Sequence, residues 1–168
     1  MRKEIEKKYL LGEKGISYAT SAAPRSIYPC RGQKIRQGYL TPQDLKALWV
    51  ESGHKPNFEI SEARLRQQGI EFYLTFKSDG TIQRTEEEHC ISPAFFQRYW
   101  PQTEGRRVEK MRIRTPYGKY SVEIDIYTDR DLITAEIEVP TLEEAQNLTP
   151  LGKDITEDPK YKNKNLAK

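Results

Sequence analysis

The sequence has few cysteines, few histidines and no long apolar run. Cys30 and Cys90 are its only cysteines, and they form neither a Cys-x-x-Cys pair nor a Cys/His cluster. This spacing argues against a structural zinc site and predicts two reduced thiols, as in the cytoplasm. No stretch of about 18 apolar residues is present, so we expect no membrane span. The N-terminus carries no hydrophobic signal segment, which favours a soluble cytoplasmic protein.

Several motifs of nucleotide-binding and hydrolytic enzymes are also missing. The chain contains no GxxxxGK[ST] and no GxGxxG loop, so any phosphate must be bound by side chains rather than by a backbone cradle. It contains no Ser/His/Asp arrangement either. His54 and His89 lie in unrelated stretches, and we expect them to be surface or packing residues rather than catalysts or ligands.

Charged and aromatic residues dominate what is present. Charged residues make up 32% of the 168 residues and apolar residues 36%. Ten tyrosines, five phenylalanines and two tryptophans supply large buriable groups, which suffices for one globular domain over residues 1–168. The formal net charge is only +3. The total charge therefore predicts no polyanion partner, and the distribution of charge decides the matter.

Most of the chain alternates between polar and apolar residues with a period of two, which is typical of β-strands. The alternation predicts strands at 3–10, 34–40, 59–68, 70–77, 81–90, 107–115, 119–127 and 133–139. Turn residues join two of the pairs, namely Ser78-Asp79-Gly80 and Pro116-Tyr117-Gly118. Many strands joined by hairpins predict an antiparallel barrel or sandwich.

Short helices are expected between the strands. Ser92 can cap a helix at 92–100 with Pro93 at its first position, and Thr141 with Glu144 forms a capping box for one at 141–148. A third helix can open near 41–44. The tail from Asp158 to Lys168 is expected to end in a short helix.

Two Glu-x-Glu pairs stand at the two ends of the predicted barrel or sandwich. Glu4 and Glu6 lie in the first predicted strand, and Glu136 and Glu138 lie in the last. Residues two apart in a strand point to the same face, so each pair places two carboxylates side by side. If the two strands meet, the four carboxylates form an all-oxygen site suited to Mg²⁺ or Mn²⁺.

Nearly every predicted strand has one charged face and one aliphatic face. The basic residues on these faces are Lys8, Arg64, Arg66, Lys77, Arg84, Lys110, Arg112 and Arg114, and the acidic ones are Glu4, Glu6, Glu86, Glu88, Asp125, Glu136 and Glu138. One interpretation is a sandwich whose charged faces look at water. The other is a wet tunnel lined by the charges and covered outside by helices, since unpaired charges cannot lie in a dry interior. Arginine, lysine and a metal together suit a phosphate chain.

In sequence order, these motifs resemble the CYTH superfamily, the triphosphate tunnel metalloenzymes. Glu4-Ile5-Glu6-Lys7-Lys8 resembles the ExExK signature, and Gln37-Gly38-Tyr39-Leu40 resembles the QGYL strand. The further matches are Arg64-Leu65-Arg66, the strand ending in Lys77, Arg84-Thr85-Glu86-Glu87-Glu88, Lys110-Met111-Arg112, Glu123-Ile124-Asp125, Glu136-Ile137-Glu138 and the tail at 154–164. The resemblance covers nearly the whole chain and is greatest to short bacterial members that cleave inorganic tripolyphosphate.

The resemblance implies a closed eight-stranded antiparallel tunnel with helices packed outside it. The implied metal ligands are Glu4, Glu6, Glu136 and Glu138, with Asp125 nearby, for Mg²⁺ or Mn²⁺. The implied phosphate ligands are Lys8, Arg64, Arg66, Lys77, Lys110 and Arg112, with Arg84 and a tail lysine, Lys162 or Lys164, less firmly placed. Glu86 and Glu88 are implied to bind a second metal or to orient the attacking water, and Tyr39 is implied to pair with Lys8.

The implied activity is metal-dependent hydrolysis of tripolyphosphate or of an organic triphosphate. An adenylate cyclase built on the same tunnel and a non-catalytic barrel that binds polyphosphate or nucleic acid stay open as alternatives. The acidic pairs would repel a nucleic-acid backbone, so the expected partner is a small-molecule triphosphate, and a homodimer is left open. The chain departs from the short bacterial pattern at 11–33 and 41–61, where insertions could cap a tunnel mouth.

Overall fold

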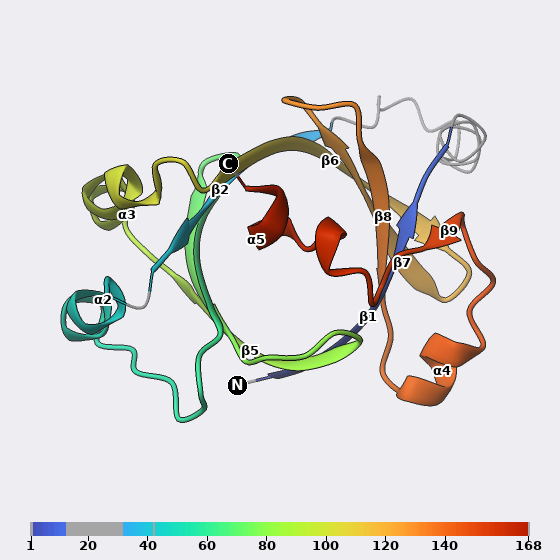
Figure 1. The fold of residues 1–168 in the computed structure, drawn as a ribbon, viewed down its shortest axis with the longest axis horizontal. Coiled ribbons are helices and arrows are strands. Elements are labelled where there is room, and N and C mark those ends of the chain that lie inside the picture. The colour runs from blue at the N-terminus through green and yellow to red at the C-terminus, as the bar shows by residue number, and fades with distance from the viewer. Residues whose placement is uncertain (1, 13–31, 42, 168) are drawn as a thin grey trace.

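Eight strands of the computed structural model, which describes residues 2–12, 32–41 and 43–167, form one closed antiparallel barrel (Figure 1). The strands are β1 Arg2–Leu10, β2 Gln33–Leu40, β3 Glu62–Gln68, β4 Glu71–Lys77, β5 Gln83–Cys90, β6 Arg107–Tyr117, β7 Tyr120–Tyr127 and β8 Ile133–Glu138. They pair in the order β5-β4-β3-β2-β6-β7-β8-β1, and a β1–β5 pairing closes the ring. The predicted mainly β barrel is confirmed. A two-residue strand, β9 Lys153–Asp154, adds to the far end of β1.

The ends of some strands differ from the prediction. The strand expected at 59–68 begins only at Glu62, and the one expected at 81–90 begins at Gln83. The hairpin expected at Pro116-Tyr117-Gly118 is tighter, since Pro116 and Tyr117 still pair within β6 and β7. The turn falls on Gly118 and Lys119, and Gly118 takes a φ of 58°, which glycine adopts without steric cost.

Two apolar clusters cover the outside of the barrel wall. In one, helices α2 Leu45–Ser52 and α3 Pro93–Tyr99 pack on β3 and β4 through Leu48, Phe96 and their neighbours. In the other, α4 Leu142–Gln146 packs on β1, β7 and β8. Figure 1 shows α2 and α3 on one side of the ring and α4 on another. The aliphatic faces therefore point outward, and the charged faces are left for the interior.

The helix signals in the sequence act as predicted at two sites. The Ser92 hydroxyl accepts a hydrogen bond from the Phe95 amide at 3.1 Å, and the Thr141 hydroxyl accepts one from the Glu144 amide at 3.1 Å. The third helix, α2, begins at Leu45. Its Leu48 is fully buried against the wall, so this part of the 41–61 insertion covers the wall and not a tunnel mouth. Most of the other insertion, residues 13–31, lies outside the described residues.

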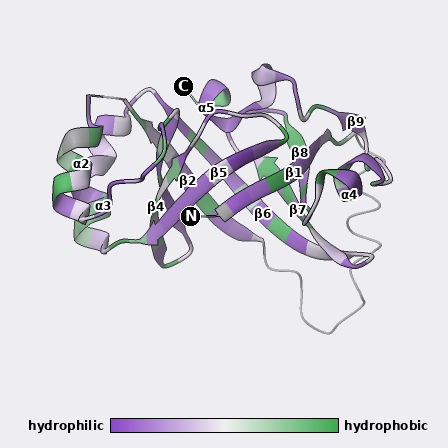
Figure 2. Cartoon of the chain, turned by 90° about the horizontal axis from the view of Figure 1, so that it is seen from below, coloured by the Kyte–Doolittle hydropathy of each residue, from purple (hydrophilic) through white to green (hydrophobic). Residues whose placement is uncertain are grey.

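A close contact explains the glycine in β2. A Cβ at Gly38 would lie 2.4 Å from the hydroxyl oxygen of Thr103, in the 3₁₀ helix η1 Trp100–Thr103. No side chain fits there, so η1 seats directly on the outer face of β2. Figure 2 shows hydrophilic and hydrophobic residues interleaved along β6, which is the alternation expected of a wall with a wet inner face.

The C-terminal segment returns to one opening of the barrel. After β9 it forms η2 Pro159–Tyr161 and α5 Asn163–Leu166, which lie across the ring in Figure 1. The Lys162 ammonium donates to the Gly80 carbonyl at 2.8 Å, and Tyr127 bonds with Asn163. These contacts tie the tail to the β4–β5 turn and to β7. No helix in the described ranges is long and apolar enough to cross a membrane.

Candidate active site

A cavity of about 780 Å³ lies in the barrel interior, and most of the residues that line it are charged. Ten basic and nine acidic residues line it. The basic ones are Lys3, Lys8, Arg64, Arg66, Lys77, Arg84, Arg112, Arg114, Lys119 and Lys162, and the acidic ones are Glu4, Glu6, Glu62, Glu86, Glu88, Glu123, Glu136, Glu138 and Asp158. Because the two signs nearly balance, a strongly anionic ligand would need additional positive charge beside it.

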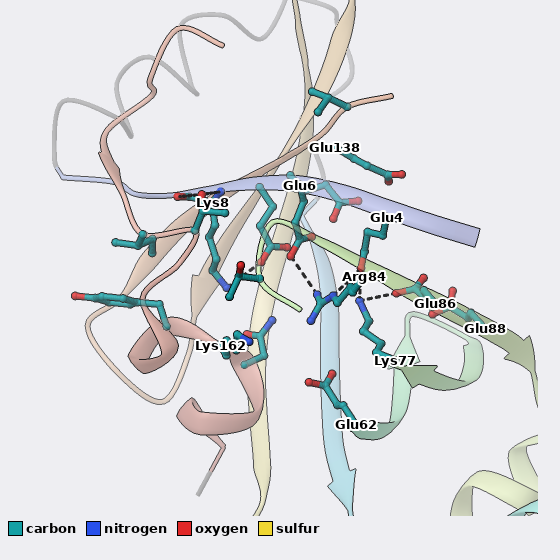
Figure 3. Close-up of a pocket in the computed structure, with 18 of the residues that line it drawn as sticks. Glu4, Glu6, Lys8, Glu62, Lys77, Arg84, Glu86, Glu88, Glu138 and Lys162 are labelled. Atoms are coloured by element: carbon teal, nitrogen blue, oxygen red, sulfur yellow. Dashed lines mark hydrogen bonds and ion pairs between the residues drawn. The ribbon is translucent and has the colours of Figure 1, made fainter. Parts of the chain in front are cut away.

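The two Glu-x-Glu pairs meet, because β1 and β8 are neighbours. Glu6 lies opposite Glu138, and Lys8 lies opposite Glu136 in the β1–β8 register. All four glutamates line the cavity. Figure 3 shows Glu4, Glu6 and Glu138 close together along β1. The predicted juxtaposition of acidic pairs from the two ends of the chain is therefore present.

Glu4 is held by two cations. The Lys77 ammonium lies 2.8 Å from its carboxylate, and the Arg84 Nε lies 2.9 Å from the same oxygen. Lys77 also pairs with Glu86 at 2.5 Å. Burial disfavours the charge on Glu4, but the attraction of Lys77 and Arg84 outweighs it and lowers the pKa to about 2. Glu4 is a carboxylate at any physiological pH.

Glu6 is in the opposite state. Burial and the neighbouring charges of Glu136 and Glu4 together raise its pKa to about 7, because the attraction of Arg84, at 3.1 Å, and of Lys77 does not offset them. Negative charge is thus under-compensated where the four glutamates meet. Carboxylate oxygens with surplus negative charge match a hard divalent cation. In this arrangement lysine and arginine hold the carboxylates, and within the described residues no three Asp, Glu, His or Cys side chains form a ligand set.

A second network runs along the wall through the neighbouring strands β1, β8, β7 and β6. Glu136 accepts from Lys8 at 2.9 Å and from Arg112 at 3.1 Å, and both cations lower its pKa against the effect of burial. Arg112 also forms a two-point pair with Asp125, at 2.7 Å for each contact. Lys110 completes the network at 2.5 Å from Asp125. Two-point pairing fixes the orientation of the Arg112 guanidinium.

Lys110 and Asp125 are not among the residues that line the cavity. Their side chains are 1% and 0% exposed, whereas Arg112 beside them reaches the cavity. Burial lowers the pKa of Lys110 to about 8, and the cations Arg112 and Lys8 add to this effect while Asp125 opposes it. In this structure the pair lies beneath the cavity surface, and Asp125 holds the Arg112 guanidinium in place.

The β3 arginines present donors to the cavity. Arg66 contacts both oxygens of Glu88 at 2.9 and 3.0 Å, and Arg64 lies 3.7 Å from the same carboxylate. The Nε atoms of Arg64 and Arg66 are buried and have no hydrogen-bond partner. An unsatisfied buried donor is costly, but these two atoms are enclosed, so an anion in the cavity would meet the terminal nitrogens of the guanidiniums instead.

The implied Lys8–Tyr39 pair is not formed. The Tyr39 hydroxyl accepts a hydrogen bond from the Gln37 amide at 2.6 Å, and Lys8 is bound to Glu136. Burial raises the Tyr39 pKa well above its ordinary value, with Glu62 adding to the effect. The phenol therefore stays protonated and can donate a hydrogen bond, but it cannot act as a phenolate.

The cavity brings together the other implied residues. Its lining includes Lys8, Tyr39, Arg64, Arg66, Lys77, Arg84, Glu86, Glu88, Arg112 and Lys162 besides the four glutamates. It also includes charged residues to which the sequence hypothesis gave no role as a ligand or catalyst, namely Lys3, Glu62, Arg114, Lys119, Glu123 and Asp158. Strand alternation gives a signal for three of them, since Glu62, Arg114 and Glu123 lie two residues from Arg64, Arg112 and Asp125. Lys119, in the turn, has none.

His54 and His89 are related in space although not in sequence. Their rings stack with centroids 3.6 Å apart, and His89 bonds with Glu87 at 2.8 Å. Neither histidine lines the cavity. Their expected role as surface or packing residues agrees with this placement.

A closed antiparallel barrel with a charged interior defines a class of tunnel proteins, and known proteins bear this out. No protein-family model matches the sequence. An inorganic triphosphatase of Nitrosomonas europaea is 40% identical over 140 residues, 79% of this chain and 83% of that protein. An inorganic triphosphatase of Acetivibrio thermocellus is 30% identical, covering 100% of this chain and 95% of that one.

Solved structures agree. The inorganic triphosphatase NE1496 is 34% identical with a TM-score of 0.59, over 99% of this chain and 95% of that one. A Bacillus halodurans structure provisionally described as an adenylate cyclase has a TM-score of 0.59 over 87% and 86%, but its 16% identity shows likeness of fold alone. The chain belongs to the CYTH superfamily of triphosphate tunnel proteins, in the family of the inorganic triphosphatases.

Proposed function

We propose that this protein is a divalent-metal-dependent triphosphatase that hydrolyses inorganic tripolyphosphate and releases phosphate. The observation that carries the proposal is that the two acidic pairs and a set of basic side chains, Arg64 and Arg66 among them, line one cavity inside the barrel. Relatives at 40% and 30% identity are named inorganic triphosphatases. A chain of linked phosphates with a divalent cation satisfies both sets of residues, because the phosphates pair with the basic side chains and the cation with the carboxylates.

Binding of the substrate is assigned to the basic residues of the wall. Arg64 and Arg66 offer forked donors, and Lys8, Lys77 and Lys162 offer point charges from β1, β4 and the tail. Arg84 and Arg112 link these groups to the acidic pairs. Lys110 and Asp125, which were implied as a phosphate and a metal ligand, are proposed to act through Arg112 by fixing its orientation.

The glutamates are proposed to hold Mg²⁺ or Mn²⁺. Glu4, Glu6, Glu136 and Glu138 would be its protein ligands, because under-compensated carboxylate charge lies between them. When bound, the cation supplies positive charge that offsets the phosphate oxygens. Glu4 and Glu6 would have to exchange contacts with Arg84 and Lys77 for contacts with the cation, which frees these basic side chains for the substrate.

The basic residues of the barrel wall contribute to catalysis by positioning the substrate and by stabilising charge. Arginine and lysine hold a linear triphosphate extended along the cavity, so that the terminal phosphorus is open to in-line attack. The same charges stabilise the negative charge that develops on the leaving oxygen. The tail across one opening, with Tyr161 and Asn163 lining the cavity, limits the water that surrounds the substrate.

A phosphate-release panel tests the proposal. Tripolyphosphate, ATP and thiamine triphosphate would each be incubated with Mg²⁺, Mn²⁺ or Ca²⁺, and with no divalent cation. We expect phosphate from tripolyphosphate with Mg²⁺ or Mn²⁺ and no release without a cation. Cyclic AMP from ATP would instead support the cyclase, and tight binding without metal-dependent turnover would support a binding barrel. The cytoplasmic location, the single domain over 1–168 and a homodimer stay predictions from the sequence.

A further inference from the structure

One acidic side chain of the cavity differs from the acids described above. Within the part of the chain that the structure describes, the Glu62 carboxylate accepts no hydrogen bond and forms no ion pair, although it lines the cavity and is only partly exposed. In Figure 3 it points into the cavity, and no interaction line reaches it. Glu4, Glu86, Glu88 and Glu136 are each tied to a lysine or an arginine.

The surroundings of Glu62 are cationic. It lies two residues before Arg64 on the same face of β3, and opposite Lys77 of β4. It interacts electrostatically with Arg64 and with Arg84 of β5, and with the Tyr39 phenol of β2. A phosphate group held by Arg64 would therefore lie beside the Glu62 carboxylate.

A carboxylate and a phosphate cannot share a hydrogen bond directly, because both are acceptors. A proton donor must stand between them, and water is the donor that the reaction already requires. Lys77 does not serve, because it keeps its pair with Glu86 at 2.5 Å when Glu4 turns to the cation, and no hydrogen bond or ion pair joins it to Glu62 in the described residues. Glu86 and Glu88 are poor choices for holding the water, because their oxygens are engaged by Lys77, Arg64, Arg66 and Thr75.

We propose that Glu62 is the carboxylate that holds the attacking water and takes its proton, an assignment that rests on the proposed triphosphatase function. The water oxygen bonds to the terminal phosphorus, and the bond from that phosphorus to its bridging oxygen breaks. The electron pair stays on the bridging oxygen, which leaves as pyrophosphate. One proton of the water remains on the new phosphate, and the other passes to Glu62 and then to solvent. Glu62 is thereby a catalytic residue, distinct from the metal and phosphate ligands.

The test compares E62Q with E62D, E86Q and a matched control, E59Q, whose exposed carboxylate is outside the cavity. Each variant would be assayed with tripolyphosphate for kcat, KM and the Mg²⁺ concentration that gives half-maximal activity. We expect kcat of E62Q to fall roughly 100-fold or more, the usual size of a lost general base, with KM and the Mg²⁺ requirement nearly unchanged. E62D should retain an intermediate kcat, E86Q should act mainly on KM through Lys77, and E59Q should match the wild type.

Each other result overturns the assignment in a recognisable way. If E62Q keeps the wild-type kcat, Glu62 does not take the proton of the water, and its carboxylate only repels the phosphate beside it. A raised Mg²⁺ requirement would make it a metal ligand, and a raised KM with unchanged kcat would make it a binding residue. Because its carboxylate forms no hydrogen bond or ion pair and only attracts Arg64 and Arg84 at longer range, E62Q should lower the unfolding temperature only slightly. A much lower midpoint together with an E62D as active as wild type would show a structural role. If the wild type itself releases no phosphate, the proposed triphosphatase function fails, and the assignment of Glu62 fails with it.

Discussion

The Glu6 carboxylate lies 3.1 Å from the Arg84 guanidinium, yet its pKa is raised to about 7. Burial and the charges of Glu136 and Glu4 cause the rise, and Arg84 cannot cancel it because it also serves Glu4 at 2.9 Å. The single positive charge of Arg84 is thus shared between Glu4 and Glu6. The protein retains a charge imbalance at the place where four glutamates converge.

Glu6 should therefore destabilise the metal-free protein at high pH. Its folded pKa of about 7 exceeds the ordinary 4.5, so the folded state keeps a proton that the unfolded state has lost between these values. Stability from this group is present below pH 4.5, declines as the pH rises, and is lost above 7. E6Q should raise the free energy of unfolding by on the order of 1–3 kcal/mol at pH 8 and by little at pH 4.5. Urea unfolding at both pH values checks this, and an equal gain at both would contradict it.

Removal of both carboxylates of the first acidic pair should abolish turnover without unfolding the protein. The E4Q/E6Q double variant keeps the shape of both side chains but offers a cation no charge. Mg²⁺ or Mn²⁺ should raise the melting temperature of the wild type, since a ligand that binds only the folded state stabilises it, and should leave that of the double variant unchanged. E59Q provides the control. A folded double variant that hydrolyses tripolyphosphate normally would refute the metal-dependent mechanism.

Strand alternation predicts much of this fold and less of its site. It shows which residues face the interior on each strand. Alternation alone leaves a sandwich and a closed barrel open, and the order of the family motifs decides between them. Alternation does not show how deeply each inward-facing side chain is buried. Lys110, Arg112 and Arg114 share one face, but Lys110 is 1% exposed and pairs with the fully buried Asp125, while Arg114 is 58% exposed and pairs with the partly exposed Glu123.

Pairing within the barrel is also beyond the sequence. Lys8 can reach several acids, and only the β1–β8 register brings it to Glu136 rather than to Tyr39. The same holds for Glu62, whose isolation is visible only when the partners of every neighbouring cation are known. Sequence motifs thus identify the residues of the site, whereas contacts distinguish those that position other groups from those left free to react.

Arg64 and Arg66 should control substrate binding. Loss of a charged hydrogen bond costs about 1.5–3 kcal/mol, so R64Q or R66Q should raise KM for tripolyphosphate roughly 10- to 100-fold with a smaller effect on kcat. The control is R98Q, which removes the same charge from an exposed pair with Glu51 on the outer surface. Steady-state kinetics at two salt concentrations measures the effect, which should shrink at high salt as the remaining attraction is screened. Equal KM values in R66Q and R98Q would exclude a direct role.

Asp125 should be the most costly charge to remove from the wall. D125N leaves Lys110 and Arg112 buried without their shared anion, which should lower the free energy of unfolding by about 3–5 kcal/mol at pH 7.

Part of this loss of stability should vanish at pH 9.5. The pKa of Lys110 is lowered to about 8, so above pH 8 the folded lysine is already neutral in the wild type and in the variant alike. K110M/D125N should recover stability, because it removes the stranded lysine charge, and Arg112 keeps Glu123 and Glu136 as partners. Urea unfolding of the two single variants and the double variant gives the coupling between the pair. A double variant less stable than D125N would show that Lys110 stabilises the wall by packing, and not by its charge.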